Sequence, residues 1–152
     1  GREVGRGDAP VLFEPVGVHA RIDEVDGDQA GILRVRCLGG ERFRLEGEPS
    51  QQPDGLWQSM IRDVAPDRHR LPAPAMFDTV KALSNAIATL RERGQLPLVE
   101  PFRLDDAGWV ANRWCELLPI PLSAKQKLMA LEDPVVRLSL VDGYLRDKQV
   151  VR

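Results

Sequence analysis

Prolines divide the last third of the sequence into short segments, and this division constrains the fold more than any other feature. From Trp109 to Leu118 the apolar residues recur at helical spacing, which predicts a helix. Pro119 and Pro121 then end it, because proline lacks the backbone N–H that a helix interior requires. Ser123, with a glutamine three residues later, has the pattern of a capping box and predicts the start of the next helix.

Two further helices are predicted on either side of this run. Asp133 followed by Pro134 is typical of a capped helix start, since the first helical position needs no backbone donor. Upstream, apolar residues spaced three or four apart define one face of a long helix, and Gly94 can close it in a left-handed conformation. That face consists of Met76, Val80, Leu83, Ile87 and Leu90. The second half of the chain therefore predicts a bundle of about four helices.

The first half has the two-residue period of half-buried strands. Asp26–Asp28 and Gly39–Gly40 are predicted turns between the first three strands, which would form an antiparallel meander. The predicted strands are Val16–Ile22, Leu33–Cys37, Phe43–Leu45 and Leu56–Val64. Strands followed by helices indicate an α+β protein with segregated subdomains. We expect a β-rich subdomain over residues 1–70 and a helical subdomain over residues 71–152.

Three segments in the expected order resemble motifs of the Lon protease (peptidase S16) N-terminal domain family. They are VGVHARI at Val16–Ile22, GGERFRL at Gly39–Leu45 and DPVVRL at Asp133–Leu138, preceded by the proline-rich turn. The resemblance covers Val16 to Asp147 and implies a PUA-like pseudo-barrel followed by a helical bundle. The family's opening strands are not found before Val16, so we expect an incomplete β-subdomain, in a stand-alone bacterial member of the family.

No catalytic, cofactor or metal site is predicted. The chain has no glycine-rich phosphate loop, and Ser123 beside Lys125 is better explained as a helix cap than as a nucleophile. His19 and His69 lie in separate predicted elements without metal-ligand spacing, and the carboxylates between residues 23 and 28 are expected to form a solvated turn. Two cysteines, at positions 37 and 115, are expected to be buried apolar residues rather than a disulfide. We therefore predict that the chain is not an enzyme.

Charge and hydropathy argue against nucleic acid and membranes as partners. A net charge of −2, with 21 basic and 23 acidic residues, provides no basic surface for nucleic acid or anionic lipid. No apolar run approaches membrane-spanning length, and the first residues lack the apolar core of a secretion signal. A cytoplasmic protein is expected.

The resemblance implies a module that binds unfolded or damaged polypeptides, alone or with a protease or chaperone partner. Trp57, Met60 and Trp109 are candidate contact residues because large apolar side chains contribute the most area. Arg42 and Arg44, on the expected outer face of their strand, could steer acidic segments. A core position for either tryptophan, and a solvated sheet face for the arginines, remain open alternatives.

The alternative function is RNA binding, because the family's β-subdomain resembles barrels associated with RNA modification. Its affinity would fall steeply with salt. The slightly acidic charge balance and the single tyrosine argue against it.

Overall fold

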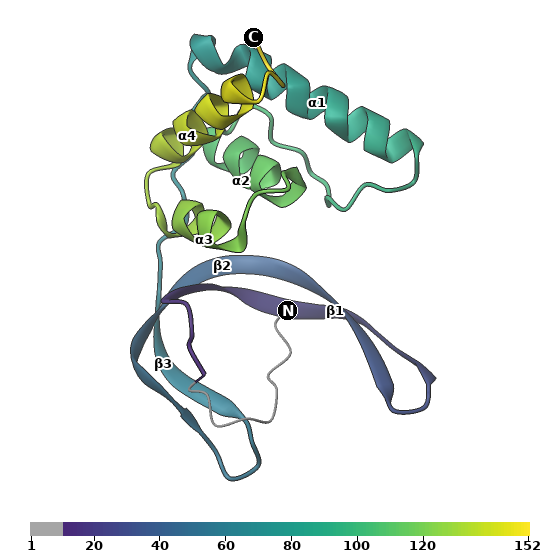
Figure 1. Cartoon of the computed structure of the whole chain (residues 1–152), viewed down its shortest axis with the longest axis vertical. Helices are drawn as coiled ribbons and strands as arrows, with labels where there is room; N and C mark the ends of the chain where they lie inside the picture. Colours follow the sequence, from purple (N-terminus) through teal and green to yellow (C-terminus); the bar gives the residue numbers. More distant parts are fainter. Residues whose placement is uncertain (1–10) are drawn as a thin grey trace. The chain divides into compact units, whose positions relative to one another are not determined.

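The computed structural model describes residues 11–152, which form two compact units that divide between Pro66 and Asp67 (Figure 1). The first unit is an antiparallel sheet and the second is helical, so the predicted α+β fold is confirmed. Its strands are β1 (Val16–Gln29), β2 (Ile32–Gln51) and β3 (Trp57–Asp63), in the order β1-β2-β3. The helices are η1 (Pro74–Met76), α1 (Phe77–Glu92), α2 (Ala107–Leu117), α3 (Leu122–Ala130) and α4 (Pro134–Asp147).

The units divide four residues earlier than the expected boundary after Arg70. Two contacts attach the intervening residues to the helical unit. The Asp67 carboxylate accepts a hydrogen bond from Arg137 in α4, and the Arg70 carbonyl accepts one from the backbone N–H of Ala107 in α2.

Both predicted turns of the meander are wrong. β1 continues through Asp26 to Gln29, and the chain reverses at Gly31, whose φ of 81° is readily adopted only by glycine. Gly39 lies inside β2, so two predicted strands are one long strand, and the sheet has three strands instead of four over the residues that the structure describes.

A β-bulge explains the two adjacent glycines of β2. Val18 pairs with Arg42 and Ala20 pairs with Gly39, so two residues of β2 lie opposite His19 alone. A Cβ at position 40 would lie 3.4 Å from the His19 carbonyl oxygen. Glycine therefore allows the close approach of the two backbones at this bend.

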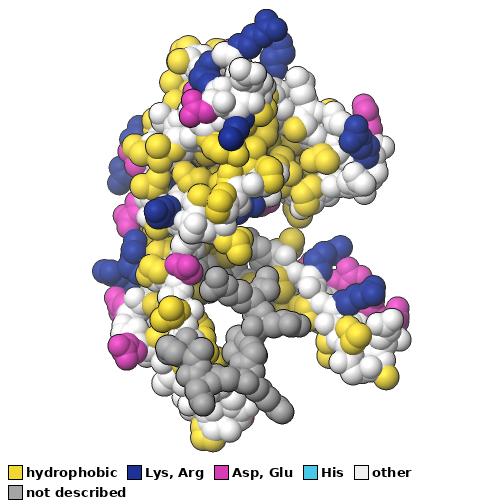
Figure 2. All heavy atoms as spheres, in the orientation of Figure 1, with side chains coloured by type: hydrophobic (Ala, Val, Ile, Leu, Met, Phe, Trp, Pro, Cys, Tyr) yellow, Lys and Arg dark blue, Asp and Glu magenta, His cyan; other side chains and the backbone are white. Residues whose placement is uncertain are grey.

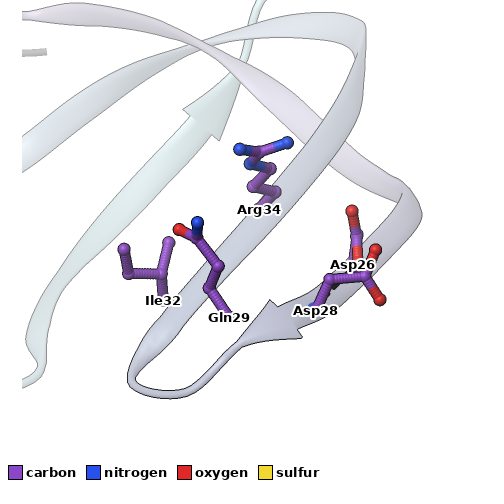
Figure 3. A pocket seen from close by; sticks show the side chains of 5 residues that line it. All are labelled: Asp26, Asp28, Gln29, Ile32 and Arg34. Atoms are coloured by element: carbon purple, nitrogen blue, oxygen red, sulfur yellow. Dashed lines mark hydrogen bonds between the residues drawn. The ribbon is translucent and has the colours of Figure 1, made fainter.

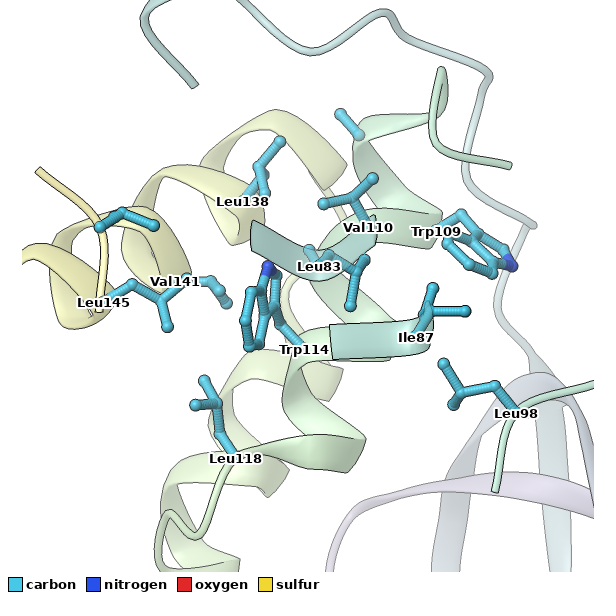
Figure 4. Packing of buried hydrophobic residues seen from close by; sticks show 13 residues of the cluster. Leu83, Ile87, Leu98, Trp109, Val110, Trp114, Leu118, Leu138, Val141 and Leu145 are labelled. Atoms are coloured by element: carbon cyan, nitrogen blue, oxygen red, sulfur yellow. The ribbon is translucent and has the colours of Figure 1, made fainter. Parts of the chain in front are cut away.

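The helical unit is built on one apolar core to which α1, α2 and α4 contribute (Figure 4). Leu83 and Ile87 of α1 lie in it, as the helical spacing predicted. Trp114 of α2 is buried beside them, and its indole N–H donates to the Thr79 carbonyl at 3.1 Å. None of the described helices is long and apolar enough to cross a bilayer.

The helix starts match the predictions unevenly. The Asp133 carboxylate caps α4 by accepting from the N–H groups of Val135 and Val136, with Pro134 at the first helical position, as predicted. The predicted cap at Ser123 is wrong, because α3 already begins at Leu122 and has no side-chain cap.

A buried cation connects the elements of the helical unit. Arg137 of α4 is only 1% exposed. Its guanidinium donates to the carboxylate of Asp67 at 2.5 Å, to the side-chain oxygen of Asn112 at 3.2 Å, and to the carbonyls of Leu128 and Leu131. One side chain thus joins α4 to α2, to the end of α3 and to the segment before η1.

Gly108 leaves space for this ion pair. A Cβ at Gly108 would lie 2.7 Å from the Asp67 carboxylate oxygen and 3.1 Å from the Pro134 Cβ, whereas a Cβ at Gly143 in α4 would meet nothing within 4 Å. We expect G108A to lower the free energy of unfolding by about 1–3 kcal/mol through overpacking. The control G143A, inside α4, should raise it by about 0.5–1 kcal/mol, because alanine favours a helix interior over glycine and would meet no neighbour there. Urea titrations followed by helical circular dichroism measure both, and equal effects would contradict the clash.

A second prediction concerns Asp142, which accepts hydrogen bonds from Thr79 at 2.6 Å and Arg146 at 2.8 Å. Burial opposes its ionisation, but the hydrogen bonds from Arg146 and Thr79 hold the pKa of Asp142 below its ordinary value. The ionised group therefore stabilises the fold above the unfolded-state pKa of about 3.9, and this contribution is lost as pH falls through the lower folded-state pKa.

D142N should lower the free energy of unfolding by about 1–2 kcal/mol at neutral pH and flatten its decline in acid. The control D147N makes the same charge change at an exposed site on the same helix. An unchanged acid dependence in D142N would show that another carboxylate is responsible.

Candidate functional site

The sheet unit exposes most of its large apolar side chains. Among its described residues, Val16 is the only buried hydrophobic residue. Figure 2 shows hydrophobic side chains at the surface of the molecule, and those of the sheet unit come from all three strands. The exposed set in β1 to β3 is Val18, Ile22, Val25, Ile32, Leu33, Val35, Trp57, Met60 and Ile61. Uncovered apolar area of this kind indicates a binding surface.

Strand pairing places these side chains on two faces, because paired residues share a face and neighbours along a strand alternate. We call the first the valine face. It carries the alternate residues of β1 from Val16 to Ile22, together with Arg42 and Arg44 of β2 and Met60 of β3. The other, which we call the phenylalanine face, carries His19, Phe43, Leu45, Trp57 and Ile61. Phe43 lies 5.1 Å from the His19 ring, as residues on one face should.

Three of the five predicted contact residues, Arg42, Arg44 and Met60, therefore gather on the valine face. Met60 is 73% exposed, and both arginines are half-buried. The arginines were expected on an outer face away from apolar groups. Pairing instead puts Arg42 beside Val18 and Arg44 beside Val16.

The structure does not bring the two predicted tryptophans to that face. Trp57 lies on the phenylalanine face, 39% exposed, with its ring 5.0 Å from that of Phe13. Trp109 is only 8% exposed and belongs to the core of the helical unit, beside Phe102 and under the Arg113 guanidinium. The core alternative therefore describes Trp109, and little of its surface can meet a ligand.

Two arginines of the sheet, Arg36 and Arg62, form ion pairs with its carboxylates. Arg36 contacts Asp23 at 2.6 Å and Glu24 at 3.2 Å, and Arg62 contacts Glu46 at 3.1 Å. The hydrogen bond with Asp23 and the charge of Glu24 raise the pKa of Arg36. These pairs reduce the positive potential that an anionic ligand would meet.

A small hollow lies at the tip of the β1–β2 hairpin, lined by both signs of charge (Figure 3). Asp26, Asp28 and Arg34 surround it, with Gln29 and Ile32. The predicted solvated turn is thus the end of a strand, and two of its carboxylates, of Asp26 and Asp28, line the hollow. No group of three metal-ligating side chains occurs among residues 11–152.

Residues 6–147 match the family model of the ATP-dependent protease La (LON) substrate-binding domain. The chain belongs to this family. The resemblance predicted from the sequence motifs is therefore confirmed, and the match leaves five residues of this chain on either side.

Solved structures of Lon N-terminal domains share the fold. A Lon N-terminal domain protein from Xanthomonas campestris superimposes with a TM-score of 0.69 at 25% identity, over 86% of this chain and 68% of that one. The N-terminal domain of Mycobacterium avium complex Lon protease superimposes with a TM-score of 0.59 at 18% identity, over 91% of this chain and 74% of that one. No curated protein matches the sequence significantly.

Membership has a direct functional meaning. The substrates of a protease are polypeptides, so a Lon substrate-binding domain binds polypeptide substrates in general. The matched domain is non-catalytic, and the family model covers nearly all of these 152 residues without an ATPase or protease domain.

Sequence reasoning missed part of the exposed surface of this Lon domain. The strands were predicted to be half-buried, yet Ile22, Leu33 and Val35 are each about half exposed or more. The sequence carried no signal of this exposure, because the same alternation of apolar and charged residues is expected whether the apolar face is covered or not.

The expectation of two buried cysteines is also wrong for Cys37, which is exposed because it lies on the distal, uncovered part of β2. Cys115 of α2 is partly buried, and burial raises the pKa of its thiol. Both cysteines are free.

This difference predicts two thiol reactivities. We expect Cys37 to react with a maleimide at least about tenfold faster than Cys115, because Cys37 is exposed while burial both shields the Cys115 thiol and raises its pKa. Time-resolved mass spectrometry of the labelled Lon domain measures both rates. C37S should remove the fast phase and C115S should keep it; a single rate for both thiols would contradict the structure.

Proposed function

We propose that this Lon domain is a non-catalytic module that binds unfolded or damaged polypeptides through its sheet unit. The observation that carries the proposal is the exposure of apolar side chains on all three strands, where Val16 is the only buried hydrophobic residue that the structure describes. Unfolded chains are distinguished from folded ones by accessible apolar side chains and backbone, and such a surface complements both.

Met60 supports a binding site without strict sequence preference. Its side chain is long, unbranched and mostly exposed, so it can adapt to apolar groups of different shapes. Arg42 and Arg44 lie beside Val18 and Val16 on the same face, where the apolar stems of their side chains add to the contact area. A protease or chaperone that receives the bound polypeptide is part of the same proposal.

RNA binding has less support. Ion pairs neutralise Arg36 and Arg62 on the sheet, and the chain as a whole carries a net charge of −2. A phosphate backbone requires several accessible cations at once.

The proposal is tested with a reduced, alkylated polypeptide that stays unfolded and carries a fluorophore. We expect saturable anisotropy changes with a Kd on the order of 10–100 μM. Raising salt from about 50 mM to about 300 mM should change the Kd by less than about twofold, since apolar contacts are not screened. A labelled RNA should bind weakly or not at all.

Two variants on opposite faces serve as a matched pair. M60A should weaken polypeptide binding by about tenfold, as expected for an exposed anchor residue. W57A, on the phenylalanine face and packed on Phe13, should change it by less than about threefold. The reverse ranking would move the site to the other face, and the absence of binding by the parent chain would refute the function.

A further inference from the structure

β1 and β2 extend beyond β3 as a two-stranded hairpin, which we call the arm (residues 20–39; Figure 1). β3 pairs with β2 only from Phe43 to Gln51, with one further hydrogen bond from Val64 to Arg42. No strand of the described chain pairs with residues 32–41 of β2 on that side. The arm therefore has an open edge in line with β3.

The two faces of the arm differ in chemistry. A second bulge, at Asp23, shifts the alternation of β1 by one residue, so Ile22, paired with Cys37, and Val25, paired with Val35, both lie on the valine face. Leu33 follows Val35 at strand spacing. None of these five side chains is charged. The apolar four, Ile22, Val25, Leu33 and Val35, are between 49% and 68% exposed.

The charges of the arm gather on its other face. Glu24 pairs with Arg36 and Asp26 with Arg34, which places these four opposite to the apolar side chains. The same face bears the hollow of Figure 3. An uncharged, apolar partner therefore complements the apolar face. A charged partner would lose its hydration there without gaining an ion pair.

The size of the apolar face indicates what kind of partner it fits. Four aliphatic side chains, each about half exposed, offer on the order of 200–300 Å². A second copy of the chain would need about 800 Å² on each partner for a stable dimer. A single extended segment needs far less area, because pairing along a strand edge adds main-chain hydrogen bonds to the apolar contacts.

We propose that the arm binds one extended, uncharged apolar segment of a polypeptide as an added strand along residues 32–41 of β2, with alternate side chains on the apolar face. This inference rests on the proposed function and extends its site from Met60 to the arm, on the same face of the sheet. Backbone pairing supplies affinity that does not depend on sequence, and the apolar face selects against charged segments.

Cys37 provides a native probe on this face. A photo-crosslinker attached to Cys37 should capture the unfolded fluorescent polypeptide. As a control, the same crosslinker is attached to the variant C37S/S139C, whose new cysteine lies on the exposed side of α4 in the helical unit; it should capture at least about fivefold less. Hydrogen exchange at residues 32–41 should slow when the polypeptide is added, as expected for an edge that gains a strand.

Matched substitutions test the apolar face itself. I22T/V35T keeps β-branched residues in the strands while adding hydroxyls, and should weaken binding by at least about tenfold. I61T makes the same exchange on the phenylalanine face and should leave binding within about twofold. With the unmodified chain, a peptide of about ten alternating valines and threonines should compete, and its counterpart with aspartate at alternate positions should not.

The outcomes separate this inference from the proposed function. One outcome would overturn the arm as the site and leave the function intact. In it, the parent chain binds the polypeptide, both crosslinker positions capture it equally, and I22T/V35T binds it as tightly as the parent chain. Dimerisation that is lost in I22T/V35T, measured by sedimentation, would overturn it in favour of a second copy. Absence of any binding by the parent chain would overturn both.

Discussion

The arrangement of the helical unit depends on the burial of one guanidinium. Arg137 carries its charge into the core, where its partners are the Asp67 carboxylate, the Asn112 amide and the carbonyls of Leu128 and Leu131. A buried charge that loses a partner costs about 3–5 kcal/mol, so these partners cannot move independently. α2, the end of α3 and the segment that leaves the sheet unit are consequently held in one arrangement around α4.

Sequence reasoning succeeded where structural signals are local. The spacing of Leu83 and Ile87 defines a helix face within the helix itself, and the Asp133 carboxylate caps the backbone of its own turn. It failed where the decision lies in a distant strand. Gly39 and its neighbour suit a tight turn and a bulge equally well, and only the pairing of β2 with His19 and its flanking residues in β1 selects the bulge.

The same distinction applies to the candidate site. Size and charge identified Met60, Arg42 and Arg44 as candidates, and pairing places all three on one face. Their position beside β1 could not be read from their own strands, because a bulge changes which residues lie opposite each other. Trp109 has the same chemistry as an exposed anchor, but the packing of α2 places it in the core. Residue type therefore indicated what could bind, and strand register and helix packing decided what is accessible.

The two units use apolar residues in opposite ways. Thirteen buried hydrophobic residues form the core of the helical unit, whereas the described sheet unit buries Val16 alone. The sheet is thus held mainly by ladder hydrogen bonds and ion pairs such as Arg36 with Asp23, which contribute little at an exposed surface. Any ligand that covers the valine face supplies apolar burial that the sheet lacks, and by linkage it stabilises the folded sheet. The uncovered side chains thus link two properties: they leave the sheet with little apolar burial of its own, and they give the proposed polypeptide ligand a surface to cover.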